Sequence, residues 1–244
     1  MLWLWPGQAL YVGPSLVLDV HSGSVSCLAV GVDAEFTVWL ENGPCHVTRT
    51  ALIAARVRHR IVAHGDRMAF CYLDPVSARE TACRRMMSGD AELALGHRHE
   101  LELSRLAGVM DGGTSVPAAR HWLDLAGHDD AAETRDARIR QATRRLSEDA
   151  GQQLSAQKLA AEVGLSVSTF LRLFRAQTGT TFRRYRLWTR MLRVATLLET
   201  WPDLSTAAVE AGFASPSHFS SAFHAMFGLR PSRLLAGDVT IRAA

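Results

Sequence analysis

The sequence predicts an α+β chain of two domains: a small β-barrel or sandwich with appended helices, then an all-α domain in which one unit occurs twice. Short β-prone runs occupy residues 10–75, helical periodicity begins at residue 76, and one pattern recurs between residues 154 and 231. A chain of 244 residues is long enough for two such domains. The polar, aperiodic segment 127–134 predicts the boundary, which divides the chain into 1–130 and 131–244.

The first domain is expected to begin with strands and end with helices. Strands at this spacing are typical of a sandwich or barrel, with the best hairpin signals at Asn42-Gly43 and Gly65-Asp66. The predicted strands are 15–20, 25–30, 36–41, 46–50, 51–54, 60–63 and 68–73. Helices are expected over 76–87, 91–110 and 117–126, and a further helix over 135–149 leads into the repeat.

Each copy of the repeat has the spacing of a helix-turn-helix unit, at about 155–177 and 204–226. Two short helices cross closely where a small residue lies at the contact and a glycine permits the turn. The recurring residues are Ala160, Gly164, Phe170, Phe174 and Gly179, then Ala208, Gly212, Phe219, Phe223 and Gly228, at offsets of 48 and 49. The expected helix caps are Ser155, Ser166, Ser205 and Ser215.

The segment 181–200 between the two units predicts one long helix. About eighteen residues at 1.5 Å each give roughly 27 Å, close to the roughly 34 Å of one DNA turn. A stiff connector of this length would place the second helix of each unit in successive major grooves on one face of a duplex.

The charge is distributed unevenly between the two predicted domains. Residues 1–134 carry 11 Lys and Arg against 16 Asp and Glu, a net of −5, whereas residues 135–244 carry 16 against 8, a net of +8. A basic half built on a twofold repeat of this kind favours nucleic acid as its partner.

The remaining composition indicates no metal and no cofactor. The four cysteines all lie in the first third without a C-x-x-C spacing, which favours reduced thiols. His97-Arg-His99 resembles a metal-binding fragment, but we interpret it as a solvated helix face. The apolar start lacks the features of a signal peptide, and no run is long enough to cross a membrane, so a cytoplasmic location is expected.

Part of the sequence resembles a known protein family. Residues 138–235 are similar to the DNA-binding domain of AraC/XylS-type transcriptional regulators. The most specific part is Ala211-Gly-Phe-x-Ser-x-Ser-His-Phe-Ser-x-x-Phe-x-x-x-Phe-Gly-x-x-Pro231, and Arg175-x-x-Thr-Gly179 fits the first unit. Ala51-Leu-Ile, Arg58-His-Arg60 and Tyr72-Leu-Asp-Pro75 carry a looser likeness to the cupin-like sensor domain of some of these regulators.

The resemblance implies a sequence-specific DNA-binding regulator that reads successive major grooves of an operator. A small-molecule effector, or dimerisation through the helices in 76–126, would modulate it, and RNA polymerase is an expected partner. The alternative is a cupin-type metal-dependent enzyme with a helical appendage, which a metal bound within 15–75 would favour. A further alternative makes the first domain purely an oligomerisation module.

The resemblance also implies which side chains contact DNA. In the first unit Ser168, Leu171 and Arg172 would face the groove, and Arg172 could pair with guanine for roughly 1–3 kcal/mol of discrimination. Phosphate contacts are expected from Arg175, Arg183 and Arg184. The second unit offers Ser217, His218 and Ser221, where relatives often carry arginine or lysine near Ser221 and His224, so it is expected to contact mainly backbone.

Four residues of the first domain are candidates for an effector site. Arg56, Arg58 and His59 lie in a basic cluster beside a predicted strand, which could instead be a charged edge that discourages strand pairing. Trp39 is the fourth, although a tryptophan in a strand is more often part of the core.

Overall fold

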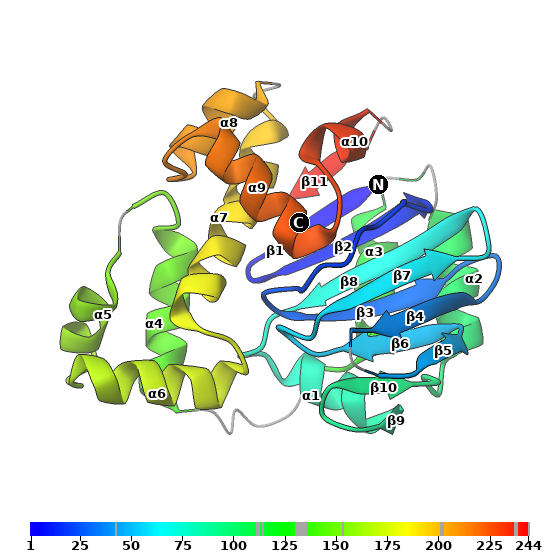
Figure 1. Ribbon diagram of the computed structural model, residues 1–244, viewed down its shortest axis with the longest axis horizontal. Helices are drawn as coiled ribbons and strands as arrows, with labels where there is room; N and C mark the ends of the chain where they lie inside the picture. Colours follow the sequence, from blue (N-terminus) through cyan, green and yellow to red (C-terminus); the bar gives the residue numbers. More distant parts are fainter. Residues whose placement is uncertain are drawn as a thin grey trace.

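The computed structural model describes residues 1–41, 43–110, 113, 115–129, 136–152, 154–200, 203–236 and 239–243. Asn42 of the predicted hairpin and most of the predicted boundary segment lie outside these residues. The fold class is confirmed: a domain of two β-sheets with covering helices precedes a helical domain with two helix-turn-helix units (Figure 1). Within the described part of the chain, no helix combines the length and apolar character needed to cross a membrane.

The N-terminal half forms two sheets, one of eight strands in the order β11-β1-β2-β8-β3-β6-β10-β9 and one of three in the order β5-β4-β7. Their bounds are β1 Leu2–Trp5, β2 Gln8–Pro14, β3 Ser26–Gly31, β4 Phe36–Leu40, β5 Cys45–Thr48, β6 Thr50–Ile53, β7 His59–Ala63, β8 Arg67–Leu73, β9 Ser88–Gly89, β10 Leu93–Leu95 and β11 Ile241–Ala243. Among the described residues, β1 pairs with β11 in parallel and the other strand pairs are antiparallel.

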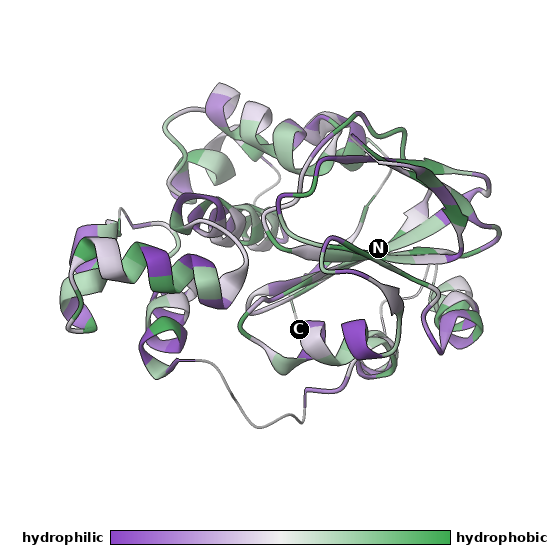
Figure 2. Cartoon of the chain, turned by 60° about the horizontal axis from the view of Figure 1, so that its bottom comes forward, coloured by the Kyte–Doolittle hydropathy of each residue, from purple (hydrophilic) through white to green (hydrophobic). Residues whose placement is uncertain are grey.

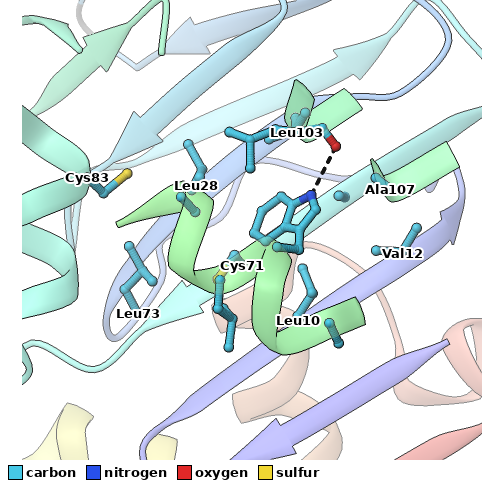
Figure 3. Packing of buried hydrophobic residues seen from close by; sticks show 14 of the residues in the cluster. Leu10, Val12, Leu28, Cys71, Leu73, Cys83, Leu103 and Ala107 are labelled. Carbon is cyan, nitrogen blue, oxygen red and sulfur yellow. Dashed lines mark hydrogen bonds between the residues drawn. The ribbon is translucent and has the colours of Figure 1, made fainter. Parts of the chain in front are cut away.

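The large sheet buries side chains on both faces, because successive residues along each strand point alternately into one of two cores. One face packs with the small sheet through residues such as Phe36, Val38 and Phe70. The other face is covered by α1 Ala78–Arg85, α2 Glu100–Met110 and α3 Val116–Ala126. There the buried Trp122 donates its indole Nε1–H to the carbonyl of Leu103 at 3.0 Å (Figure 3).

Three sequence predictions in this half were wrong. Strands β1 and β2 were missed, although Pro6-Gly7 between them is a turn signal and Gly7 has a φ of +75°. Residues 15–20 are no strand, because the chain leaves the sheet at Pro14, which lacks a donor for continued pairing. Residues 91–99 are not helical: β10 pairs with β6, and α2 begins only at Glu100.

The C-terminal half contains α4 Ala137–Glu148, α5 Ala156–Glu162, α6 Val167–Thr178, α7 Phe182–Leu198, α8 Leu204–Glu210, α9 Pro216–Phe227 and α10 Pro231–Leu235. The hydropathy of these helices alternates along the ribbon, as in amphipathic helices with one buried face (Figure 2). Ser155, Ser166 and Ser215 cap their helices as predicted, by accepting backbone N–H bonds. Ser205 does not cap α8; Asp203 does, through bonds from two backbone N–H groups.

The two halves share cores rather than merely touching. Strand β11, at the end of the chain, pairs with β1 at its beginning. Trp188 of α7 and Phe227 of α9 pack on Tyr72 of β8, with ring centroids 5.5 Å and 5.3 Å away. The second helix-turn-helix unit therefore rests directly on the first domain (Figure 1).

Candidate nucleic-acid interface

The first unit is held by an aromatic cluster on the inner side of α6. Phe170 and Phe174 are fully buried, and both rings lie within 6 Å of Phe182, at centroid distances of 5.8 Å and 5.7 Å. Gly164 makes the turn with a φ of +68°, and Gly179 ends α6 in the left-handed conformation. This packing fixes which side of α6 faces solvent.

The predicted contact residues of the first unit lie on that exposed side of α6. Ser168, Leu171, Arg172 and Arg175 are all exposed, and Leu171 leaves 40% of its surface in solvent although it is apolar. Ser168 stays near the start of the helix, with its hydroxyl 3.2 Å from that of Ser166. An exposed leucine beside exposed arginines suits the floor of a major groove, which presents thymine methyls and guanine acceptor atoms.

The second unit repeats this geometry on α9. Gly212 makes the turn at φ +86°, and Ser217, His218 and Ser221 are exposed. The Nδ1 atom of His218 accepts a hydrogen bond from the Ala214 backbone N–H at 3.4 Å, so the neutral ring carries its proton on Nε2. The Nε2–H of this exposed residue is a donor for a phosphate or for the acceptors of a purine edge.

The C-terminal part of α9 contacts the first domain. Ser22 N–H donates to Ala225 O at 3.2 Å, and Asp19 N–H donates to Gly228 O at 2.8 Å. The His224 Nε2 atom lies 3.0 Å from the Asp19 carboxylate, and this hydrogen bond lowers the pKa of Asp19 below its ordinary value. These contacts tie α9 to the loop between β2 and β3. Nothing in the local sequence of Asp19 or His224 indicates this pairing.

The two arginines at the start of α7 differ in their surroundings. Arg183 is exposed, as a phosphate contact requires. Arg184 is half-buried: its Nη2 atom donates to the Ser22 hydroxyl at 2.8 Å and to the Ser22 carbonyl. Burial lowers the pKa of Arg184, and the nearby charge of Arg56 lowers it further. The structure thus places Arg184 against the first domain, which revises its predicted role toward an interdomain contact.

The four candidate effector residues lie close together in the first domain but differ in access. Trp39, Arg58 and His59 line one surface hollow of about 440 Å³. Trp39 is 49% exposed, so it is not a core residue, and Arg58 is paired with Glu41 at 2.9 Å. Arg56 lies in a neighbouring cleft together with Arg58 and with Arg175 of α6.

His59 is the least accessible of these residues. It is 3% exposed, its Nδ1 atom contacts Val57 O at 2.9 Å, and its ring lies 4.3 Å from that of His21. Burial, followed by the charge that His21 would carry, lowers the pKa of His59 to about 4. His59 is therefore a neutral residue that packs in the core of this region. A neutral, buried imidazole is poorly suited to bind an anionic effector directly.

The His97-x-His99 fragment and the remaining candidate ligands do not form a metal site among the described residues. No group of three His, Cys, Asp or Glu side chains there is placed to hold an ion. His97 is 2% exposed and bonds to Ala126 O at 3.2 Å, so its interpretation as a solvated helix face was wrong. Cys27, Cys71 and Cys83 are buried free thiols, and Cys45 is an exposed one.

Comparison with known proteins identifies the helical half. Residues 159–237 match the family model described as a helix-turn-helix domain. Over 107 residues the chain is 31% identical to the HTH-type transcriptional activator RhaS of Klebsiella pneumoniae strain 342, a match that covers 43% of this chain and 38% of RhaS. The chain thus spans less than half of that relative.

Solved structures with the same fold cover nearly the whole chain. An apo ToxT variant from Vibrio cholerae strain SCE256 matches with a TM-score of 0.62 at 15% identity, over 95% of this chain and 97% of that one. Wild-type ToxT of the same strain, solved with an unsaturated fatty acid bound, matches with a TM-score of 0.59 at 13% identity, over 94% and 95%. These matches confirm the two-domain fold. The C-terminal half of this protein contains a helix-turn-helix domain, and its helices form two helix-turn-helix units.

Proposed function

We propose that the protein is a sequence-specific DNA-binding transcriptional regulator that contacts one face of a duplex with α6 and α9. The observation that carries this proposal is that both second helices keep an exposed polar face while α7 joins them. The seventeen residues of α7 correspond to about 26 Å at 1.5 Å each, close to the spacing of successive major grooves.

The two units have different roles in this proposal. Arg172 and Leu171 read bases, because a guanidinium can bind guanine bidentately and a leucine can contact a thymine methyl. Arg175 and Arg183 bind phosphates, which supply affinity without sequence preference. On α9, Ser217, His218 and Ser221 contact the backbone and add limited base readout.

The first domain modulates DNA binding in this proposal, by binding a small-molecule effector or by forming a homodimer. The shared cores support this proposal, because a conformational change in the first domain would alter the packing of α7 and α9. The solved ToxT structure with a bound unsaturated fatty acid gives a precedent within the same fold. RhaS is named an activator, and we propose that this protein likewise activates transcription through contact with RNA polymerase.

The test is selection of bound duplexes from a random pool, followed by footprinting of the enriched sequence and of the DNA flanking the protein's own gene. An enriched sequence that survives excess competitor DNA supports the proposal. Binding that is weak, erased by moderate salt and equal for all sequences contradicts it, because non-specific binding is almost wholly electrostatic.

A further inference from the structure

The second helix-turn-helix unit lacks basic residues. Residues 204–226 contain no lysine and no arginine, whereas residues 155–177 of the first unit contain Lys158, Arg172 and Arg175. Phosphate contacts from lysine and arginine supply a large share of the affinity of a protein for DNA. If α9 approaches a duplex, the positive charge beside it must therefore come from another part of the chain.

The first domain brings an arginine to α9. Arg58, just before β7, lines a cleft of about 540 Å³ together with Ala225 of α9 and Arg183 of α7. Ala225 follows Ser217 and Ser221 at intervals of four residues, so it lies on the same side of the helix as these two exposed serines. The side of α9 that is proposed to face DNA thus leads directly to Arg58.

A second arginine of the first domain lies near the end of α9. The hydrogen bond from His224 is the main cause of the lowered pKa of Asp19, and the charges of His224 and Arg60 lower it further. Arg60 is therefore close to the C-terminal part of α9. Arg58 and Arg60 are both exposed and lie two positions apart in extended chain, where alternate side chains point to the same side.

The same segment also reaches α6. Arg56 and Arg58 line another cleft, of about 820 Å³, together with Arg175 of α6. Arg175 lies seven positions after Ser168, on the same exposed side of that helix. Arg58 therefore lines a cleft with each recognition helix, and the segment 56–60 of the first domain lies between α6 and α9.

The charge of this segment is available to a partner. Arg58 pairs with Glu41, but the two side chains are 57% and 45% exposed, and such a pair contributes little in water. Arg56 and Arg60 form no ion pair within the described part of the chain. The three clefts around the segment are lined by seven arginines and three glutamates, a net of +4, although residues 1–134 as a whole carry −5. Such a local positive field attracts a polyanion.

The backbone of Arg56 gives independent support. Its φ is +71°, the one positive value among the described residues other than glycine. Its N–H donates to Gly23 O at 2.9 Å, which holds this conformation. Glycine adopts the left-handed region at much lower cost than a residue with a Cβ. An arginine at a position better suited to glycine favours a functional role for its guanidinium.

We propose that Arg56, Arg58 and Arg60 of the first domain form a third DNA-contacting element, which binds the sugar–phosphate backbone between the two groove segments occupied by α6 and α9. This inference rests on the proposed function, because it requires both helices to face one duplex. The three arginines supply phosphate contacts that the second unit lacks. They add affinity without base preference, because phosphate contacts carry no sequence information.

The experiment measures binding of the full-length protein to the selected operator and to a random duplex, by anisotropy between 50 and 200 mM KCl. Arg56→Gln, Arg58→Gln and Arg60→Gln should each reduce the slope of log affinity against log salt by about 0.9, the value for one phosphate. The advantage of the wild type over each variant should then shrink about threefold across this salt range. Base preference should stay unchanged, and the three Arg→Lys variants should retain the wild-type slope.

Glu41→Gln separates a DNA contact from a structural role of the Arg58 ion pair. If the pair only stabilises the fold, Glu41→Gln should weaken DNA binding as Arg58→Gln does. If Arg58 binds phosphate, Glu41→Gln should strengthen DNA binding, because the competing carboxylate is gone.

Arg120→Gln is the matched control for the loss of charge. Arg120 is an exposed arginine of α3, which covers the face of the large sheet opposite the small sheet (Figure 1). This variant should keep the wild-type salt slope, and thermal melting should show that all variants fold.

Wild-type salt slopes in all three Arg→Gln variants, or weaker DNA binding in Glu41→Gln, would overturn the proposal. Its failure is separable from that of the proposed function. If an operator is enriched but the three variants keep the wild-type slope, only the third element is wrong. If no sequence is enriched but the variants lose slope on the random duplex, the third element stands and the sequence-specific regulator falls. Absence of binding to any duplex overturns both.

Discussion

Trp188 of α7 donates its indole Nε1–H to the backbone carbonyl of Gly7 at 3.0 Å, and this bond joins the helix-turn-helix half to the first β-hairpin of the chain. Gly7 and Trp188 are 181 positions apart in the sequence, and Trp188 is 1% exposed. The helix that connects the two helix-turn-helix units is therefore also a structural part of the first domain.

Trp188→Phe should lower the free energy of unfolding by about 1–3 kcal/mol, because the Gly7 carbonyl loses its buried partner. It should also reduce the cooperativity between the two halves, seen as a broadened or split calorimetric transition. Trp122→Phe is the control, since Trp122 makes an equivalent bond to Leu103 within the first domain and should destabilise without splitting the transition. Identical calorimetric profiles for both variants would contradict this role of Trp188.

Gly164→Ala and Gly228→Ala should differ in cost although their backbones are alike. Both residues have a positive φ, +68° and +74°, so each alanine costs about 1 kcal/mol in backbone strain. A Cβ at Gly164 meets nothing within 4 Å, whereas one at Gly228 would lie 2.6 Å from Asp19 O and from His21 Nδ1. Gly228→Ala should therefore cost more in urea denaturation and weaken the α9 contact with the loop. Equal losses for the two variants would disprove the close approach.

Arg172→Ala and Arg175→Ala should affect DNA binding in different ways. Arg172→Ala should relax base preference at one position of the selected operator, at a cost of roughly 1–3 kcal/mol. Arg175→Ala should weaken binding evenly across sequences and reduce the slope of log affinity against log salt by about one. Anisotropy titrations on matched and mismatched duplexes over a salt series measure both. An unchanged base preference in Arg172→Ala would remove it from the base-reading set.

The stability of the protein should fall as the pH decreases from about 6.5 to about 4. His59 has its pKa lowered from 6.5 to about 4 by burial, so over this interval the unfolded chain binds the proton and the folded one does not. Its contribution is fully present above pH 6.5, with a slope of up to about 1.4 kcal/mol per pH unit inside the window. Urea denaturation as a function of pH should give a flatter profile for His59→Gln than for His121→Gln, which alters an exposed histidine. Parallel profiles would show that His59 does not cause the pH dependence.

The helix-turn-helix units were predictable because their signal is local. Ala160, Gly164 and Phe170 lie within one turn-linked pair of helices, and spacing alone specifies their packing. The exposed side of α6 followed from the same periodicity, since Phe170 and Phe174 face inward.

The contacts between the halves were not predictable from the same patterns. Arg184 binds Ser22 across 162 positions, and His224 meets Asp19 across 205. Such pairs produce no periodic pattern in the sequence. The sequence therefore predicts a phosphate contact for Arg184 of α7, whereas the structure shows Ser22 beside it. The burial of His59 was equally unpredictable, because His21, which packs against it, comes from the loop between β2 and β3.

Hydroxyl-radical footprinting of the selected operator tests the central claim most directly, because it reports which helical face of the duplex the protein covers. We predict two protected patches about one helical turn apart on one face, with protection under α6 reduced more than protection under α9 in Arg172→Ala. A single protected patch, or two patches on opposite faces of the duplex, would contradict the proposal that α6 and α9 enter successive major grooves.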